Sequence, residues 1–183
     1  MIRYAMVIFV FCSSVALAQT APPQPAPMPR AANPLSVGSL DPLIGTWEGS
    51  GKLARTGAAV GSITSFEKRI NGDTIFVVHR ERAPNTYEYN ALISFDSVTG
   101  ELVMLMASNN KNGGRLLRSS GWQGDKLVFT ADHALHAWFA EEKLTFERQG
   151  PDQITATYEM SRDKGATWRV GDTQVYKRVP AGG

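Results

Sequence analysis

The chain has 183 residues, a hydrophobic fraction of 43% and a formal net charge of +2, from 19 Lys and Arg against 17 Asp and Glu. This length and composition are typical of one globular domain with a single core. Because the charge is near neutral and the basic residues are scattered, the sequence does not have the basic patch of a nucleic-acid-binding protein, and we expect no nucleic-acid partner.

Residues 1–18 have the pattern of a secretory signal peptide. Arg3 precedes an apolar run from Met6 to Phe11, and the segment ends in Val-Ala-Leu-Ala, which places small residues where a signal peptidase cleaves. We expect cleavage after Ala18 and a periplasmic or secreted mature protein. No later segment approaches the roughly 20 consecutive apolar residues that a spanning helix needs, so we expect no membrane span.

The mature chain is expected to begin with a linker and to contain no thiol. Cys12, the single cysteine, lies in the leader, so after cleavage neither a disulfide nor a thiolate metal site can form. Residues 19–40 are rich in Pro and Ala, a composition that favours extended, solvated backbone and predicts a disordered linker. The folded domain is then expected over residues 41–179.

Short segments of strand composition alternate with turn residues from residue 43 onward, at intervals of about ten residues. Turns such as Asn71-Gly72-Asp73 are tight, so strands that are neighbours in sequence should pair with each other. This pattern predicts an all-β fold, an up-and-down antiparallel β-barrel of about ten strands. The expected strands are residues 43–54, 60–70, 74–82, 86–95, 101–108, 113–122, 126–131, 137–148, 153–160 and 167–178.

Trp47 is the expected anchor of the first strand. Gly49 and Gly51 follow it at a spacing of two and permit tight coiling of the strand. An indole buries a large apolar area and keeps an N–H that a nearby carbonyl can satisfy. We therefore expect Trp47 to close one end of the barrel. Trp47, and Trp168 near the other end of the chain, are both expected to have a structural role.

Two of the expected strands are apolar on both faces. In residues 74–82, Ile75 and Val77 alternate with Phe76 and Val78, and residues 101–108 follow the same pattern. In a barrel whose outer surface is exposed to solvent, only the inward faces of the strands are expected to be apolar. The outer face should be covered by the linker or by a second copy of the chain, or remain as an exposed apolar patch. A homodimer is one hypothesis.

The segment 132–143 supports two interpretations. Asp132 is an N-cap candidate followed by good helix formers, so a short helix or an irregular loop competes with a strand that begins near Trp138. His133 and His136 have a spacing that brings two imidazoles near one metal ion. No third or fourth ligand with recognisable spacing accompanies them, so we expect no metal site.

Residues 161–168 match the Asp-box pattern Ser-x-Asp-x-Gly-x-Thr-Trp of sialidase-like propellers. A propeller repeats this motif in successive blades, whereas here it occurs once. We interpret it as a structural turn, in which Asp163 accepts backbone hydrogen bonds, Gly165 takes a positive φ and Trp168 packs beneath the hairpin. The motif does not predict a sialidase.

The interior of such a barrel is where a ligand is expected. His79 shares a strand face with Ile75 and Val77, and a barrel of this size can enclose a small molecule between aromatic and Met side chains. The competing interpretation is a packed core with one satisfied histidine. Arg115 or Arg118 is a candidate to point inward towards an anionic group, although solvated arginines are more common. The expected ligand-binding residues are His79, Tyr87, Tyr89, Met104, Met106 and Trp138.

Three motifs carry a resemblance to a known family: Gly-Thr-Trp-Glu-Gly at residues 45–49, Phe-Asp-Ser-Val-Thr-Gly at residues 95–100, and residues 151–161 followed by the Asp-box turn. In this order they resemble an exported bacterial calycin-like family of lipocalin-like β-barrels, known mainly as a domain of unknown function, over roughly residues 40–179. More distantly, the chain is similar to nitrobindin, a ten-stranded barrel that binds haem, and to fatty-acid-binding and lipocalin barrels.

The resemblance implies a closed antiparallel barrel with a pocket, and no enzymatic activity common to the family. Nitrobindins ligate haem through a histidine near the C-terminus, and this chain has no histidine after His136. We therefore expect no haem and no other cofactor. If haem were bound, His79 would have to replace the missing C-terminal histidine as its ligand.

The leading functional hypothesis is an exported, non-enzymatic barrel that binds a small, largely apolar ligand in its interior. The alternative is an envelope scaffold that meets a protein partner through its apolar outer face and its Pro-rich arm, with no ligand. A haem protein is less favoured. An enzyme that uses His79 as a base is disfavoured too, because no acid or nucleophile partner can be placed beside it.

Overall fold

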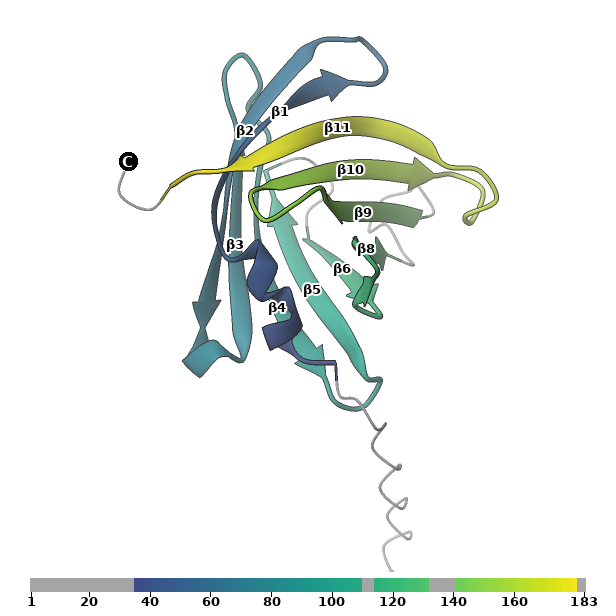
Figure 1. Ribbon diagram of the computed structural model, residues 1–183. Coiled ribbons are helices and arrows are strands. Elements are labelled where there is room, and N and C mark those ends of the chain that lie inside the picture. Colours follow the sequence, from purple (N-terminus) through teal and green to yellow (C-terminus); the bar gives the residue numbers. More distant parts are fainter. Residues whose placement is uncertain (1–34, 110–113, 132–140, 181–183) are drawn as a thin grey trace, which may run out of the picture. The chain divides into compact units, whose positions relative to one another are not determined.

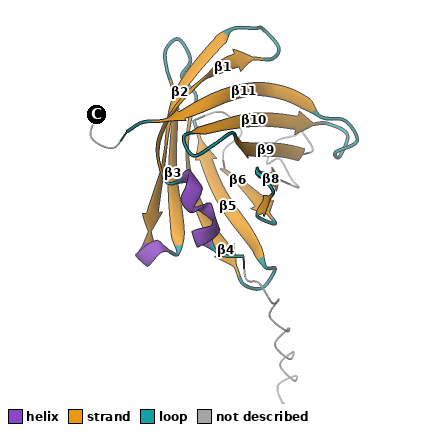
Figure 2. Cartoon of the chain, viewed as in Figure 1, coloured by secondary structure: helices purple, strands orange, loops and turns teal. Residues whose placement is uncertain are grey.

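The computed structural model describes residues 35–109, 114–131 and 141–180. Two short 3-10 helices and a series of antiparallel strands make up these residues (Figures 1 and 2). In chain order they are η1 (Val37–Leu43), β1 (Gly45–Leu53), β2 (Ala59–Arg69), η2 (Ile70–Gly72), β3 (Thr74–Glu81), β4 (Glu88–Asp96), β5 (Glu101–Ser108), β6 (Gly114–Ser119), β7 (Trp122–Gln123), β8 (Lys126–Ala131), β9 (Glu141–Arg148), β10 (Gln153–Ser161) and β11 (Arg169–Arg178).

The strands form one closed antiparallel barrel of ten, with the short strand β7 outside it. Strands β1 to β6 form a meander, β8 to β11 form another, and β1 pairs with β11 to join the two. The ring closes where Arg118 of β6 lies opposite Thr130 of β8. The all-β, up-and-down antiparallel barrel of about ten strands predicted from the sequence is confirmed.

The expected strand over residues 113–122 is divided in the structure. β6 ends at Ser119, and the chain bends through Gly121, whose φ of +89° is strained for residues with a side chain. The two residues of β7 that follow pair with β8 alone. β6 and β7 thus both pair with β8, in registers that differ by one residue across the bend.

One end of the barrel is packed solid around Trp47, as predicted. The indole is buried and its N–H donates a hydrogen bond of 2.8 Å to the carbonyl of Leu43 in η1. The guanidinium of Arg178 lies over the same ring, 4.1 Å from its centroid, and donates to the carbonyl of Pro42 at 2.8 Å. Side chains from several strands complete this core: Phe66, Ile75, Ile93, Leu102, Met104, Leu127, Phe129 and Ile154.

The helix η1 begins inside the segment that the sequence assigned to the linker. Val37, Leu40 and Leu43 are buried in the core, and η1 contacts β4 (Figure 2). These apolar residues are spaced by three, which is the period of a 3-10 helix and places them on one side. The preceding prolines obscured this pattern in the sequence. None of the helices in the described ranges is long and apolar enough to cross a membrane.

The Asp-box residues form the structural turn predicted for them, between β10 and β11. Asp163 accepts hydrogen bonds from the backbone N–H and the hydroxyl of Thr167, at 2.8 and 2.6 Å. Gly165 has a φ of +84°. These hydrogen bonds lower the pKa of Asp163 to about 2. The Trp168 ring lies beneath the ammonium of Lys143, 3.7 Å from the ring centroid.

Candidate ligand-binding cavity

The end of the barrel away from η1 contains a cavity of about 800 Å³. Its lining comes from the last residues of β1, β3 and β5, from the first residues of β4, β6 and β9, and from β10 and β11. These parts meet at one end because neighbouring strands are antiparallel. Leu117, Leu144, Ala156 and Met160 supply apolar wall, and four tyrosines, of which Tyr176 is one, add aromatic surface.

Four of the six residues expected to contact a ligand lie on this lining: His79, Tyr87, Tyr89 and Met106. Met104 does not; it is buried in the solid core, one inward-facing position further from the cavity than Met106. Trp138 lies outside the described residues, as do His133 and His136. Whether a ligand occupies the cavity remains a prediction.

His79 is held as a neutral ring in the wall. Its Nδ1 lies 2.8 Å from Thr64 Oγ1, and its ring stacks on Tyr89 with centroids 4.8 Å apart and planes 15° apart. Only 3% of the residue is exposed. Burial lowers the pKa of His79 to about 4. At neutral pH the imidazole is therefore uncharged and contributes a flat face to the cavity wall.

A buried ion pair crosses the lining between β6 and β9. Arg115 Nη1 donates to Glu142 Oε2 at 2.6 Å, and their side chains are 4% and 1% exposed. Arg115 Nη2 donates to the Tyr87 hydroxyl at 3.0 Å and to Ser108 Oγ at 3.3 Å. Burial opposes the charge of Arg115, but the neighbouring Tyr87 and Glu142 more than offset it and raise the pKa of the guanidinium.

A second polar group on the lining consists of Glu81 and Asp172. Burial, and after it the negative charge of Asp172, raise the pKa of Glu81 to about 7. Burial also raises the pKa of Asp172, although a hydrogen bond from Gln174 lowers it. Neither carboxyl forms a salt bridge within the described ranges. The carboxyl group of Glu81 therefore changes its protonation state near neutral pH.

The shape of the cavity depends on Gly49, a position in β1 without a side chain. Gly49 of β1 faces inward beneath Tyr176, and a Cβ at this position would collide with the Tyr176 ring. Ser62 lies on the same side, and its hydroxyl donates to Gln174 Oε1 at 2.6 Å. Glycine at position 49 therefore lets the tyrosine lie flat against β1, where it forms part of the wall.

Sequence reasoning missed most of the polar lining. Arg115 was one of two arginines considered for an inward position, and the structure places Arg115 inside and Arg118 outside, where it pairs with Asp96 and Glu101. Glu142 was not identified. The sequence signal for an inward Glu142 is the alternation of side chains along a strand, because Glu142 shares its face with Leu144 and Phe146.

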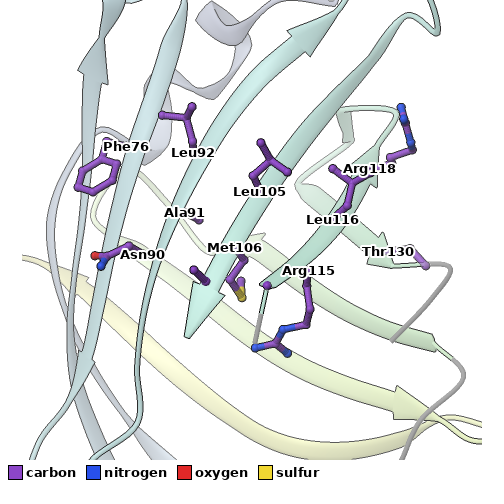
Figure 3. Close-up of a pocket in the computed structure, with 12 residues that line it drawn as sticks. Phe76, Asn90, Ala91, Leu92, Leu105, Met106, Arg115, Leu116, Arg118 and Thr130 are labelled. Atoms are coloured by element: carbon purple, nitrogen blue, oxygen red, sulfur yellow. The ribbon is translucent and has the colours of Figure 1, made fainter. Parts of the chain in front are cut away.

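The outer wall of the barrel has a separate apolar groove of about 570 Å³ (Figure 3). Phe76, Leu92, Leu105 and Leu116 lie opposite one another in register across β3, β4, β5 and β6. Leu105 is 56% exposed and Leu116 is 44% exposed. Part of the second apolar face expected from the sequence is therefore an exposed patch.

Comparisons with known proteins do not assign the chain to a family. No protein-family model matches the sequence, and no curated protein matches it. Among solved structures, the chain is similar to the structure of EF1p2_mFAP2b bound to DFHBI, with 12% sequence identity and a TM-score of 0.41, over 79% of this chain and 100% of that chain.

Proposed function

We propose that this protein is an exported, non-enzymatic β-barrel that binds a small, largely apolar molecule in its cavity. The observation that carries the proposal is the contrast between the two ends of the barrel. Around Trp47 the side chains fill the interior, whereas about 800 Å³ is left unfilled at the other end. Protein interiors are otherwise close-packed, and ligand pockets have volumes of about 300 to 1,000 Å³.

The chemistry of the lining supports the same proposal. Aliphatic and aromatic side chains make up most of the wall, and a few polar groups are fixed by hydrogen bonds to one another. Such a wall binds an apolar body and orients one polar end. His79 is a weak base because of its low pKa, and its ring is stacked and hydrogen bonded, which supports a role in the wall over acid–base catalysis.

A dye titration with a blocking variant tests the proposal. Nile red is a neutral dye whose fluorescence rises in apolar surroundings, and we expect it to bind the full chain. Ala156 is buried and lines the cavity, so Ala156→Trp should place an indole inside and weaken binding by about tenfold or more. The matched control is Thr155→Trp, on the same strand with its side chain on the opposite face.

The control variant is expected to bind Nile red as the wild type does. Absence of dye binding to the wild type would overturn the proposal. Equal affinities for the wild type and the folded Ala156→Trp variant would also overturn it, because the dye would then bind elsewhere.

Export is the part of the proposal that rests on the leader. The pattern of residues 1–18 supports it, as described above. Mass spectrometry of the protein recovered from the periplasm or the medium tests it, and we expect a mature chain that begins at Gln19. An uncleaved chain found only in the cytoplasm would contradict export without affecting the cavity.

The exposed apolar groove favours a second candidate function, that of a scaffold that binds another protein. Leu105 and Leu116 form its most exposed part, and their direct pairing makes the apolar surface continuous. In this case the protein would bind its partner through β4, β5 and β6, and substitution of the cavity lining would leave partner binding unchanged.

A further inference from the structure

Two carboxyl groups on the cavity wall have no cation beside them. Glu81 of β3 and Asp172 of β11 both line the cavity, and we call these two residues the acidic pair. Both residues are only half-buried, so a ligand in the cavity can reach them. Within the described ranges neither carboxyl forms a salt bridge. Two negative charges that act on each other without a counter-charge favour the binding of a cation.

The basic residues of the lining do not supply that cation. Arg115 is paired with Glu142 at 2.6 Å. Arg55 and Arg162 also line the cavity, but both are exposed. Burial raises the pKa of each carboxyl of the acidic pair, and no arginine lowers either pKa. The counter-charge is therefore left for a ligand to provide.

His79 places a further polar atom in the cavity, two residues before Glu81 on the same face of β3. It lines the cavity and is 3% exposed. Its Nδ1 is bonded to Thr64, whereas its Nε2 makes no hydrogen bond within the described part of the chain. Nε2 is also not among the unpartnered polar atoms that are sealed from solvent, so it stays in contact with the cavity.

Hydrogen bonds along the wall determine that His79 Nε2 is an acceptor. Ser62 donates to Gln174 Oε1, and the hydroxyls of Ser62 and Thr64 both bond to that of Tyr176. Because the Ser62 hydrogen is used on Gln174, Tyr176 donates to Ser62. The Tyr176 oxygen then accepts from Thr64, and the Thr64 oxygen accepts from His79 Nδ1. The neutral ring thus carries its hydrogen on Nδ1, and Nε2 needs a donor.

Tyrosine rings stand beside the acidic pair. Burial raises the pKa of Tyr89 and of Tyr176, and the negative charge of Asp172 raises both as well, so the carboxylate lies near both rings. Four tyrosines line the cavity in all. Aromatic faces attract cations, whereas an anion brought here would meet the negative charges of the pair. The surroundings of the pair therefore favour a positively charged group.

We infer that the ligand of the cavity is an apolar amine, a molecule with an apolar body and a primary ammonium group that binds at Glu81 and Asp172. An ammonium group has three N–H donors, and the two carboxylates and His79 Nε2 supply acceptors for them. The apolar body lies against the aliphatic part of the wall described above. This inference rests on the proposed function and names its ligand class.

A series of compounds with one tail and different polar ends tests the inference. Octylammonium, octanol and octanoate are each titrated at about pH 8, where Glu81 is mostly ionised, against the full-length protein loaded with Nile red. We expect octylammonium to displace half of the dye at about one tenth of the concentration that either of the others needs, or less. Octyltrimethylammonium, which has the charge but no N–H, should need a higher concentration than octylammonium.

A double variant assigns the preference to the acidic pair. Glu81→Gln with Asp172→Asn keeps the shape of both side chains and removes both charges, and we expect it to lose the preference for octylammonium. The matched control is Glu88→Gln with Asp73→Asn, which makes the same change in charge at exposed positions away from the lining. This control should keep the preference. The affinity for Nile red is measured on each variant first, so that displacement is compared at equal dye occupancy.

Equal displacement of the dye from the wild type by octylammonium, octanol and octanoate would overturn the inference, as would a preference for octanoate, which Arg55 and Arg162 would explain. Equal potency of octyltrimethylammonium would overturn the assigned hydrogen bonds. A preference that survives in the double variant would overturn the assignment to the acidic pair. Failure of the proposed function is a separate result, because in that case Nile red itself would not bind or would be unaffected by Ala156→Trp.

Discussion

Replacement of Glu142 by Leu would leave the guanidinium of Arg115 buried without its carboxylate. Breaking a buried pair in this way costs about 3–5 kcal/mol of unfolding free energy, because an uncompensated charge stays in the interior. Arg115→Met leaves the carboxylate unpaired and is expected to cost a similar amount at neutral pH. Each single variant should therefore be strongly destabilised relative to the wild type.

The double variant Arg115→Met with Glu142→Leu should behave differently. In the wild type, the attraction between two oppositely charged groups at 2.6 Å is opposed by their burial and by two atoms, Arg115 Nε and Glu142 Oε1, that have no hydrogen-bond partner among the described residues. Each unsatisfied atom costs about 1–3 kcal/mol, so the two together cost about 2–6 kcal/mol. Replacement of a buried pair by apolar side chains is often neutral, or stabilising by about 1–4 kcal/mol. We expect the double variant to be at least as stable as the wild type.

Urea unfolding monitored by circular dichroism measures all four proteins of this cycle. The expected result is a large interaction energy between the two positions, with the single variants well below the wild type and the double variant equal to it or above. A double variant that is well below the wild type in stability would show that the pair stabilises the fold, and would refute the reasoning that burial and unsatisfied atoms offset its attraction.

Three further predictions follow from other parts of the structure. The pKa of Glu81 is raised from 4.5 to about 7 in the folded protein, so between these pH values the folded state binds more protons than the unfolded state. The unfolding free energy should therefore fall as pH rises from about 4.5 to 7 and then level off. Urea unfolding should show a weaker decline for Glu81→Gln, and an equal decline would contradict the assignment to Glu81. Gly49→Ala should lower the unfolding free energy by about 1–3 kcal/mol, because the added Cβ displaces Tyr176. The matched control is Gly61→Ala, whose Cβ would lie 3.7 Å from its nearest neighbours and which should lower it by under about 1 kcal/mol. Equal thermal unfolding midpoints for the two variants would show that the Tyr176 ring moves aside freely. If the outer groove is a homodimer interface, analytical ultracentrifugation should detect a dimer that Leu105→Glu dissociates, and a monomer at high concentration would argue against this interface.

Which side chains face inward was readable from the sequence. Side chains alternate between the two faces of a strand, so His79, Tyr89 and Met106 could be assigned to the interior before the structure was known. Position along the barrel axis could not be read in this way. Met104 and Met106 share a face, but only Met106 lies on the cavity lining, because depth depends on the register of every strand with its neighbours.

The pairing of Arg115 with Glu142 shows the other limit of sequence reasoning. The two residues lie on β6 and β9, which are not consecutive strands, and they meet because β6 closes the barrel onto β8 beside β9. The chain also bends at Gly121, inside the segment 113–122 that its composition predicts to be one continuous strand. A contact set by barrel closure is not local, and no pattern of residue spacing predicts it.

The measurement that most directly tests the ligand-binding claim is native mass spectrometry of the full-length gene product, expressed in its own compartment and purified gently, with Ala156→Trp prepared in parallel. We predict that the wild type retains a small, largely apolar molecule and that the variant does not. A visible absorption spectrum of the same sample shows whether the retained mass is haem. A bare chain mass for the wild type would contradict the claim and favour the scaffold function.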